Sequence, residues 1–341
     1  MIRTNGCATF KQITGMKHIT ILVPNGNNNL SSIVGTYKIL TRANSYWKQH
    51  HKRTLYNIEL AGISTEVDFH GGLFSVKPHT HINNITRTDL VIIPSLSHNY
   101  EQAIAENKAI AAWIEHQYKC GAELASICTG AFLLASIGLL DYKSCSTHWS
   151  FADDFRTMFP KVDLQTDKLI TDENGIYTNG GAFSFLNLVL YLVEKYFDRD
   201  TAVFCSKVFQ IEPDRDSQSP FIIFTGQKQH NDDTIKEAQV YIENNLQEKL
   251  SIDSLSSLFA IGRRNFDRRF IKATGNSPLE YAQRVRVEAA KKLLETSRKN
   301  IHEVMYEVGY ADVKAFRDVF KKVTGMSPLA YRNKYNKLVF D

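Results

Sequence analysis

The chain has 341 residues, of which 43% are hydrophobic and 23% are charged. This length suggests two or three domains, and the composition is that of a globular protein rather than a disordered chain. No run approaches the about 18 consecutive apolar residues that a membrane-spanning helix needs, so we expect no membrane partner. Residues 1–16 lack the features of a secretory signal and are predicted to be an N-terminal extension of a cytoplasmic protein.

The cysteines and the charges further narrow the classes of protein to which this chain can belong. The five cysteines form no CxxC pair, which argues against a zinc module and a disulfide scaffold, so no metal and no cofactor are predicted. From Asp232 onward there are 20 Lys and Arg against 15 Asp and Glu, of 41 and 36 in the whole chain. The first 231 residues are therefore neutral. An excess of positive charge confined to the last third favours a polyanionic partner for that part.

Strand-like and helix-like segments alternate through residues 17–211. Short apolar runs predict buried strands, and segments with helical spacing lie between and after them. This alternation predicts an α/β domain whose parallel sheet is covered by helices on both faces. The predicted strands are Lys17–Val23, Asp89–Pro94 and Glu123–Ile127, and the predicted helices are Glu101–Tyr118, Ser184–Phe197 and Thr201–Ile211.

A cysteine lies at the junction of a predicted strand and a predicted helix. The segment ELASICTGAFLLASIGLL places Cys128 directly after the strand and before a helix that begins with Thr129 and Gly130. Such an elbow exposes a nucleophile above the sheet, and the helix dipole there favours the thiolate. His148 is the nearest candidate base. The alternative is purely structural: small residues permit close helix packing, and His148 is a hydrogen-bonding histidine.

The remaining chain divides into a linker and a helical domain with an internal repeat. Residues 212–231 are rich in polar residues and contain Pro213, Pro220 and Gly226, so they are predicted to connect the domains, with Phe221–Phe224 docked on one of them. Within residues 232–337, a pattern of Phe, Lys, Thr-Gly and Ser-Pro-Leu recurs at an offset of fifty. The second copy repeats Phe266, Phe270 and Gly275 as Phe316, Phe320 and Gly325.

Each repeat contains a short apolar helix, a turn with glycine and a polar helix. This arrangement, near 252–273 and 301–322, is that of a helix-turn-helix that presents its second helix to the DNA major groove. With Phe266, Phe270 and Ile271 assigned to the buried face, the exposed side chains are candidates for contacts with bases. Lysines toward the helix ends are candidates for contacts with phosphates. The candidate base contacts are Arg263, Arg264, Asp267, Arg268, Lys314 and Arg317, and the candidate phosphate contacts are Lys272, Lys321 and Lys322.

The stretch Leu250–Tyr335 resembles the AraC/XylS-type DNA-binding domain. The resemblance lies in RRNFDRRFIKATGNSPLEYAQRVRVEAAKKLL and in IHEVMYEVGYADVKAFRDVFKKVTGMSPLAYR. It implies two helix-turn-helix units joined by a long helix, Pro278–Thr296, that address adjacent major-groove segments. One departure is Gly262, where the family usually has a capping residue such as serine.

Residues 17–211 resemble the PfpI-type, class I glutamine amidotransferase-like superfamily. The segments ASICTGAFLLASIGLLD and STHW carry the resemblance. It implies a flavodoxin-like sandwich, but the carboxylate that usually supports the elbow cysteine is absent: PNGNNNLSS follows the first strand. The loop PSLSHN also replaces a common glycine pair. Both departures favour a pocket that binds a ligand near Cys128, Thr129, Gly130 and His148 over one that catalyses a reaction.

The order of the two domains resembles the GlxA-type transcriptional regulators. The resemblance implies a regulator that binds double-stranded DNA, senses a small molecule, forms homodimers through its N-terminal domain and contacts RNA polymerase. Two alternatives remain open at this point. One is a thiol enzyme acting on an amide, aldehyde or isonitrile at Cys128, fused to a DNA-binding domain, and the other is redox sensing by Cys128.

Overall fold

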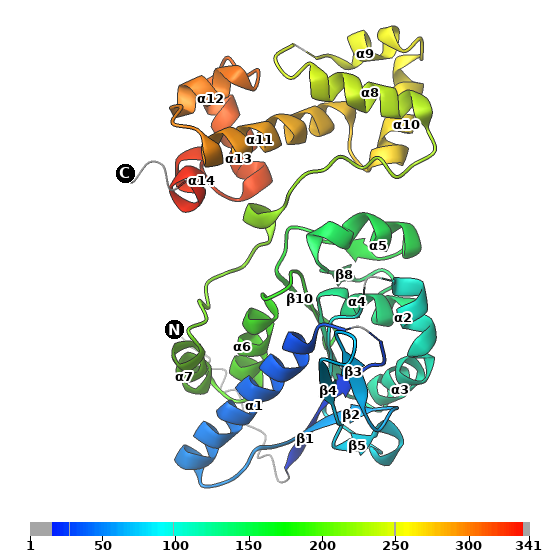
Figure 1. Cartoon of the computed structure of the whole chain (residues 1–341), viewed down its shortest axis with the longest axis vertical. Coiled ribbons are helices and arrows are strands. Elements are labelled where there is room, and N and C mark those ends of the chain that lie inside the picture. The colour runs from blue at the N-terminus through cyan, green and yellow to red at the C-terminus, as the bar shows by residue number, and fades with distance from the viewer. Residues whose placement is uncertain (1–15, 27, 98, 249, 337–341) are drawn as a thin grey trace, which may run out of the picture. The chain divides into compact units, whose positions relative to one another are not determined.

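The computed structural model describes residues 16–26, 28–97, 99–248 and 250–336. The predicted extension, apart from Met16, and residue 337 at the end of the predicted helical domain lie outside these residues. The chain divides into two units, Met1–Asp216 and Ser217–Asp341 (Figure 1). None of the described helices is both long and apolar enough to cross a membrane.

The first unit is built on a seven-stranded sheet. Its order is β10-β11-β7-β6-β1-β2-β5, and every neighbouring pair is parallel except β10 with β11. This topology confirms the predicted α/β class. In chain order the strands are β1 (Lys17–Val23), β2 (Tyr56–Gly62), β5 (Thr80–His81), β6 (Leu90–Ile93), β7 (Glu123–Ile127), β10 (Ile170–Glu173) and β11 (Ile176–Asn179).

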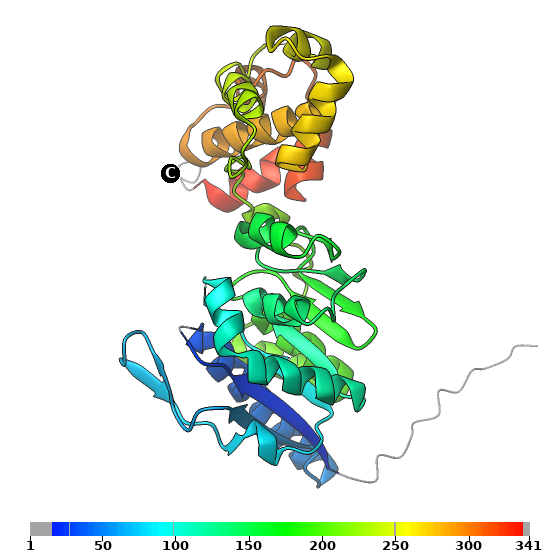
Figure 2. The same cartoon turned by 90° about the vertical axis from the view of Figure 1, so that its right-hand side faces the viewer.

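Four short strands lie outside this sheet. β3 (Val67–Phe69) and β4 (Phe74–Val76) form an antiparallel hairpin that extends from the unit, as Figure 2 shows. β8 (Ser144–Cys145) pairs in parallel with β9 (Asp163–Leu164).

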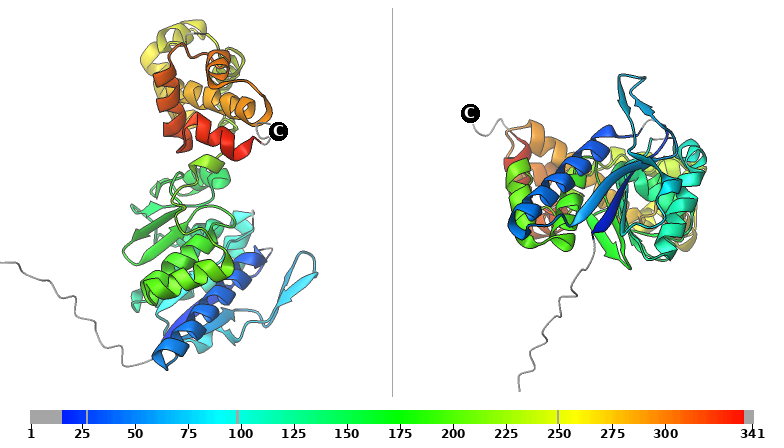
Figure 3. Two further views of the ribbon diagram at one scale, coloured as in Figure 1. Left: turned by 90° about the vertical axis from the view of Figure 1, so that its left-hand side faces the viewer. Right: turned by 90° about the horizontal axis from the view of Figure 1, so that it is seen from below.

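Helices cover both faces of the sheet because the central strands are apolar on both sides. Ile19 and Ile21 of β1 belong to one buried cluster, whereas Leu22 belongs to the cluster on the opposite face. The first face is covered by α1 (Leu30–His51), α6 (Phe185–Tyr196) and α7 (Arg199–Phe209), which pack against one another (Figure 3). The second is covered by α2 (Tyr100–Glu106), α3 (Lys108–Lys119), α4 (Ala131–Ser136) and α5 (Ala152–Met158).

The helix predicted over Glu101–Tyr118 is two helices, separated at Asn107. The Asn107 side chain donates to the carbonyl of Ala103 at 2.8 Å and to that of Asn25 at 3.1 Å, and it accepts from the Asn25 N–H at 2.8 Å. An asparagine side chain that bonds to the backbone competes with the helix, which explains the break. Apolar periodicity continues across Asn107, so it could not reveal this boundary.

The second unit consists of helices around two small cores. One core joins α8, α9, α10 and the start of α11, and the other joins the end of α11, α12, α13 and α14. The long helix α11 has the bounds that were predicted and contributes to both. The helices are α8 (Asp233–Asn244), α9 (Ile252–Leu258), α10 (Arg263–Thr274), α11 (Pro278–Thr296), α12 (Ile301–Glu307), α13 (Val313–Thr324) and α14 (Pro328–Tyr335).

The internal repeat corresponds to repeated structure. Phe266, Phe270 and their counterparts Phe316 and Phe320 are all completely buried. Gly275 and Gly325 end α10 and α13 with φ of 67° and 73°, the left-handed conformation that favours glycine. In both copies the serine that follows caps the next helix, and proline occupies its first turn. These features confirm the interpretation of the repeat.

The predicted linker 212–231 straddles the division between the units. Its aromatic residues belong to the second unit and pack on α11 and α14: the Phe224 ring lies edge-on to Tyr281 at 5.2 Å, and the Lys334 ammonium lies 4.6 Å from the Phe221 ring centroid. The predicted docking of Phe221–Phe224 is thus confirmed. We call Ser217–Asn231 the strap below.

Candidate nucleic-acid interface and cysteine elbow

The first helix-turn-helix joins α9 to α10 through a tight turn. Ala260 has a φ of 51°, and Gly262 precedes α10 without a side-chain cap. The first turn of α10 contains no acidic residue and begins with Arg263 and Arg264. Four basic side chains of α10 are exposed: Arg263, Arg264, Arg268 and Lys272.

The second helix-turn-helix joins α12 to α13 through a turn that requires glycine. Gly309 has a φ of 82°, and a Cβ there would lie 2.3 Å from the carbonyl oxygen of Leu246. Asp312 caps α13, accepting the N–H of Ala315 at 2.6 Å. Lys314, Arg317, Lys321 and Lys322 are exposed on α13, as is the acidic Asp318.

Contacts within the protein already hold several of these side chains. Arg263 forms an exposed ion pair with Asp253 at 3.1 Å, and Arg268 donates to the Asn265 side chain at 3.0 Å. Asp267 is half-buried, and its Oδ1 is buried without a hydrogen-bond partner among the described residues. Ile271, which was assigned to the buried face, is 45% exposed. That assignment was wrong because one helical step of about 100° turns Ile271 away from the line of Phe266 and Phe270.

Arg269 has a role that the sequence did not indicate. Its guanidinium donates to both carboxylate oxygens of Asp232, at 2.8 and 2.6 Å. Asp232 also caps α8, so this pair fixes α10, the second helix of the first helix-turn-helix, to the start of α8. The hydrogen bonds from Arg269 lower the pKa of Asp232. The two residues are 37 positions apart, and no spacing pattern links them.

The strand–cysteine–helix elbow is present in the first unit. Cys128 follows β7 directly and has a φ of 55°, the strained left-handed conformation expected at such a turn. A Cβ on Gly130 would lie 2.7 Å from the carbonyl oxygen of Pro94, so only glycine fits there. The small residues after Cys128 therefore serve close packing of the elbow against β6.

The Cys128 thiol does not have the electrostatics that the helix position predicted. Its side chain is 5% exposed, and burial raises the pKa of the thiol above its usual range. Hydrogen bonds from Ser95, Thr129 and the backbone of His148 act in the opposite direction without cancelling the effect of burial. The expected bias toward the thiolate is wrong, because desolvation outweighs the field of a helix end.

Thr129 fixes the elbow to the loop after β6, whereas the His148 side chain forms hydrogen bonds within its own turn. The Thr129 hydroxyl donates to the carbonyl of Leu96 at 2.8 Å and shares a 2.8 Å hydrogen bond with Ser95. The His148 Nδ1 accepts the N–H of Ser150 at 3.2 Å and lies 2.7 Å from its hydroxyl oxygen. In PNGNNNLSS, the segment without a carboxylate that follows β1, Asn28 is buried and donates to the carbonyl of Pro24 at 2.6 Å.

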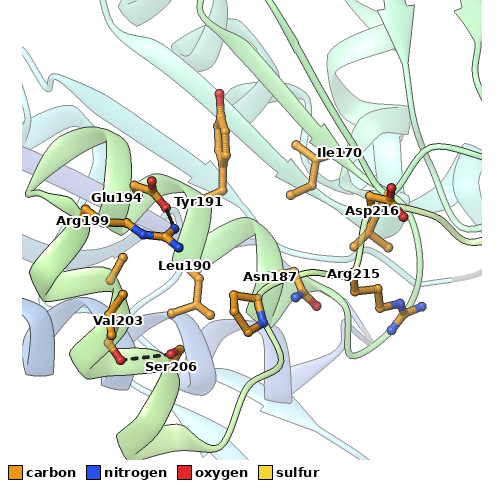
Figure 4. A pocket seen from close by; sticks show the side chains of 13 residues that line it. Ile170, Asn187, Leu190, Tyr191, Glu194, Arg199, Val203, Ser206, Arg215 and Asp216 are labelled. Atoms are coloured by element: carbon orange, nitrogen blue, oxygen red, sulfur yellow. Dashed lines mark hydrogen bonds and ion pairs between the residues drawn. The ribbon is translucent and has the colours of Figure 1, made fainter.

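A cavity that the sequence did not indicate lies in the first unit. It is formed by α6, α7, the start of β10 and residues 213–216, and its volume is about 270 Å³ (Figure 4). Among the described residues, no group of three His, Cys, Asp or Glu is arranged to hold a metal ion.

The fold and the elbow together define a class: an α/β protein with a mostly parallel sheet and a cysteine at a sharp strand-to-helix turn. The model of the DJ-1/PfpI family matches residues 17–195, more than half of the chain, and the chain belongs to this family. A helix-turn-helix domain model matches residues 255–334. This pairing confirms the resemblance to the GlxA-type regulators.

The relatives are transcriptional regulators. The chain is 28% identical over 220 residues to the HTH-type transcriptional regulator GbdR of Pseudomonas aeruginosa, covering 63% of this chain and 59% of that protein. It is 23% identical over 231 residues to the HTH-type transcriptional regulator GlxA of Rhizobium meliloti, covering 67% and 71%. A solved protein from Vibrio parahaemolyticus shares the fold of the first unit. Its TM-score is 0.52 at 24% identity, over 57% of this chain and 99% of that one.

Proposed function

We propose that this protein is a sequence-specific DNA-binding transcription regulator whose first unit senses a small molecule. The observation that carries the proposal is the set of eight exposed Lys and Arg side chains on α10 and α13, the second helices of two repeated helix-turn-helix units. Arg263 and Arg264 occupy the first turn of α10, where the positive end of the helix dipole disfavours cations. A polyanion at this surface would offset that cost.

We assign different tasks to the two groups of side chains. Arg263, Arg264, Asp267, Arg268, Lys314 and Arg317 lie in the first half of α10 or α13, where they would contact base edges. Lys272, Lys321 and Lys322 lie toward the ends of these helices, where they would contact phosphates.

Substitutions in the full chain separate these tasks. A binding site is selected from random DNA, and affinities for it and for unrelated DNA are measured at fixed salt. Arg268→Ala and Arg317→Ala should each remove about 1–3 kcal/mol of discrimination between bases, because a guanidinium can bind guanine through two bonds. Lys322→Ala should weaken both kinds of DNA about equally, and Lys108→Ala, an exposed lysine of α3, serves as the control. Equal effects of all three interface substitutions on both DNAs would refute the assignment.

Three finer statements belong to the same proposal. The first unit binds the effector, the protein forms a homodimer through this unit, and the DNA-bound form contacts RNA polymerase. Exposed apolar side chains such as Val34 and Phe183 support the dimer, since a second copy would cover them. Sedimentation equilibrium of the full chain should give twice the monomer mass, and Val34→Asp should reduce it.

We infer that Cys128 does not act as an enzyme nucleophile. Burial raises the pKa of its thiol, and the residues after β1 offer asparagine where a supporting carboxylate is expected. Turnover of an amide, aldehyde or isonitrile that Cys128→Ser abolishes would establish the thiol enzyme instead. A change in DNA affinity caused by peroxide alone, and lost in Cys128→Ser, would establish redox sensing.

A further inference from the structure

We propose that the effector binds in the cavity between α6, α7 and residues 213–216, and that it is a small carboxylic acid with an apolar body. The inference rests on the proposed function and assigns the sensing site. The sequence places that site at Cys128, yet Gly130 and the side chains of Cys128 and Thr129 are buried. The cavity lies elsewhere in the unit, among α6, α7 and residues 213–216.

The cavity has an apolar wall of suitable size. Leu190 of α6, Val203 of α7 and Pro213 line it, and its volume of about 270 Å³ lies near the lower end of small-molecule sites. A ligand with a short hydrocarbon body would fill this space and bury apolar surface. A nucleotide or another large cofactor would not fit.

The cavity lining contains the guanidinium groups of Arg199 and Arg215 and the carboxylates of Glu194 and Asp216, and we assign the binding of a carboxylate to the two guanidinium groups. Arg199 and Arg215 lie on opposite sides of the cavity in Figure 4. Arg199 is held by Glu194 at 2.6 Å, which fixes the direction of its remaining donors. Arginine binds carboxylates through paired, charge-assisted hydrogen bonds, so a carboxylate entering beside either group gains more than a neutral group would.

One wall of the cavity continues directly into the second unit. Residues 213–216 form this wall, and the carbonyl of Asp216 accepts the N–H of Leu169 at 3.1 Å. The next residue, Ser217, begins the strap. Because the connection is covalent, a ligand that orders or shifts this wall acts on the strap whatever the arrangement of the two units.

The strap is fixed to α14, which follows the second helix-turn-helix, and to the long helix α11. Tyr335, at the end of α14, donates to the carbonyl of Pro220 at 3.2 Å. Lys291 of α11 is 4% exposed, and its ammonium donates to the carbonyl of Ile222 at 2.5 Å and to Glu288 at 2.7 Å. Burying an ammonium is costly unless it is paired, so this contact holds the strap at one register.

The strap also reaches the first helix-turn-helix. The Asn276 side chain, in the turn between α10 and α11, donates to the Gln227 side chain at 3.3 Å. At its end the strap leads into Asp232, which binds Arg269 of α10. A single segment thus contacts both halves of the DNA-binding unit. A shift where the strap begins, next to residues 213–216, would therefore change the positions of both α10 and α13.

The test uses pentanoate as the probe, with pentylamine and 1-pentanol as controls of equal length. Pentanoate at ten times its dissociation constant should raise the unfolding temperature of the full chain by about 3–6 °C, and the controls should not. Pentanoate should also change the affinity for a selected DNA site by at least about threefold. Ser206→Phe, which fills the cavity from α7, and Arg215→Met should abolish both effects. Val208→Phe, on the same helix but 46% exposed and outside the cavity, should retain them.

The outcomes separate the two proposals. A thermal shift that is absent, that pentylamine produces equally, or that survives both Ser206→Phe and Arg215→Met overturns the cavity assignment. A shift lost in Cys128→Ser but kept in those two variants places the ligand at the elbow and overturns it as well. Failure of the full chain to bind specific DNA refutes the proposed regulator, and it leaves the thermal measurement of the cavity intact because that measurement needs no DNA.

Discussion

Cys128 shows how position and environment oppose each other at a single residue. Its place between β7 and a helical turn gives the strained φ of 55° that was expected from the sequence. The same close packing that imposes this conformation leaves the side chain 5% exposed, and burial raises the pKa of the thiol. Geometry alone therefore does not make a reactive cysteine, because the thiolate is the nucleophile.

We expect Cys128 to react slowly with iodoacetamide. Burial raises the pKa of the thiol, which disfavours the reactive thiolate, and it also blocks access of the reagent. Mass spectrometry of the native full chain, sampled over time, should show Cys120 modified before Cys128, since Cys120 is exposed and forms no disulfide. Denatured protein provides the control in which both cysteines react. Preferential labelling of Cys128 in the native chain would contradict the burial argument.

The two recognition helices differ at their first residue. Asp312 caps α13 with its carboxylate, whereas Gly262 offers α10 no side-chain acceptor. The backbone of Gly262, with a φ of −60° and a ψ of 137°, suits any residue, and no atom lies within 4 Å of the position of a Cβ. The uncapped start of α10 is thus a property of the side chain alone, and it can be changed without disturbing the turn.

Substitutions at the two caps should act in opposite directions. Gly262→Ser should increase hydrogen-exchange protection in the first turn of α10 by a few tenths of a kcal/mol, because the new hydroxyl accepts an otherwise unpaired N–H. Asp312→Ala should lower protection at the start of α13 by about 1 kcal/mol. Exchange is followed by mass spectrometry on the full chain, with α3 as the internal reference. Loss of protection on Gly262→Ser would mean that the start of α10 is not limited by capping.

At the scale of the whole molecule, the net positive charge is confined to the second unit. All of the net charge of +5 lies from Asp232 onward, and the exposed cations of α10 and α13 belong to that part. The strap and α11 join the two helix-turn-helix units into one body, so their cations act together on a polyanion. Release of counterions from DNA should then dominate the dependence of affinity on salt.

The affinity of the full chain for its selected site should fall linearly with salt on a double logarithmic scale. Lys322→Ala should reduce the slope by about 0.9, because one phosphate contact is lost. Lys108→Ala, in the first unit and outside both helix-turn-helix units, should leave the slope unchanged. Fluorescence anisotropy between 50 and 200 mM salt measures these slopes. An unaltered slope in Lys322→Ala would show that this lysine does not contact DNA.

The sequence predicted most local features of the chain, and tertiary contacts account for those it missed. Strands β1 and β7, helix α11 and the repeated Gly and Ser-Pro boundaries follow from patterns within a few residues. The break at Asn107 depends on its hydrogen bond to Asn25, and the position of Arg269 depends on Asp232, both far away along the chain. The exposure of Ile271 depends on a single helical step. The cavity beside α7 is lined by residues from four segments between Leu169 and Asp216, and no motif marks it.

The sequence by itself determined the α/β unit, the duplicated helix-turn-helix and the positive charge of the recognition helices. These properties follow from hydrophobic periodicity, capping residues and charge, all of which act over short distances. Only the tertiary structure decided how deeply Cys128 is buried and where the first unit has a cavity. It also decided how the strap contacts α11 and both halves of the DNA-binding unit. The reason is physical: desolvation, cavities and long-range ion pairs depend on which distant segments are packed together.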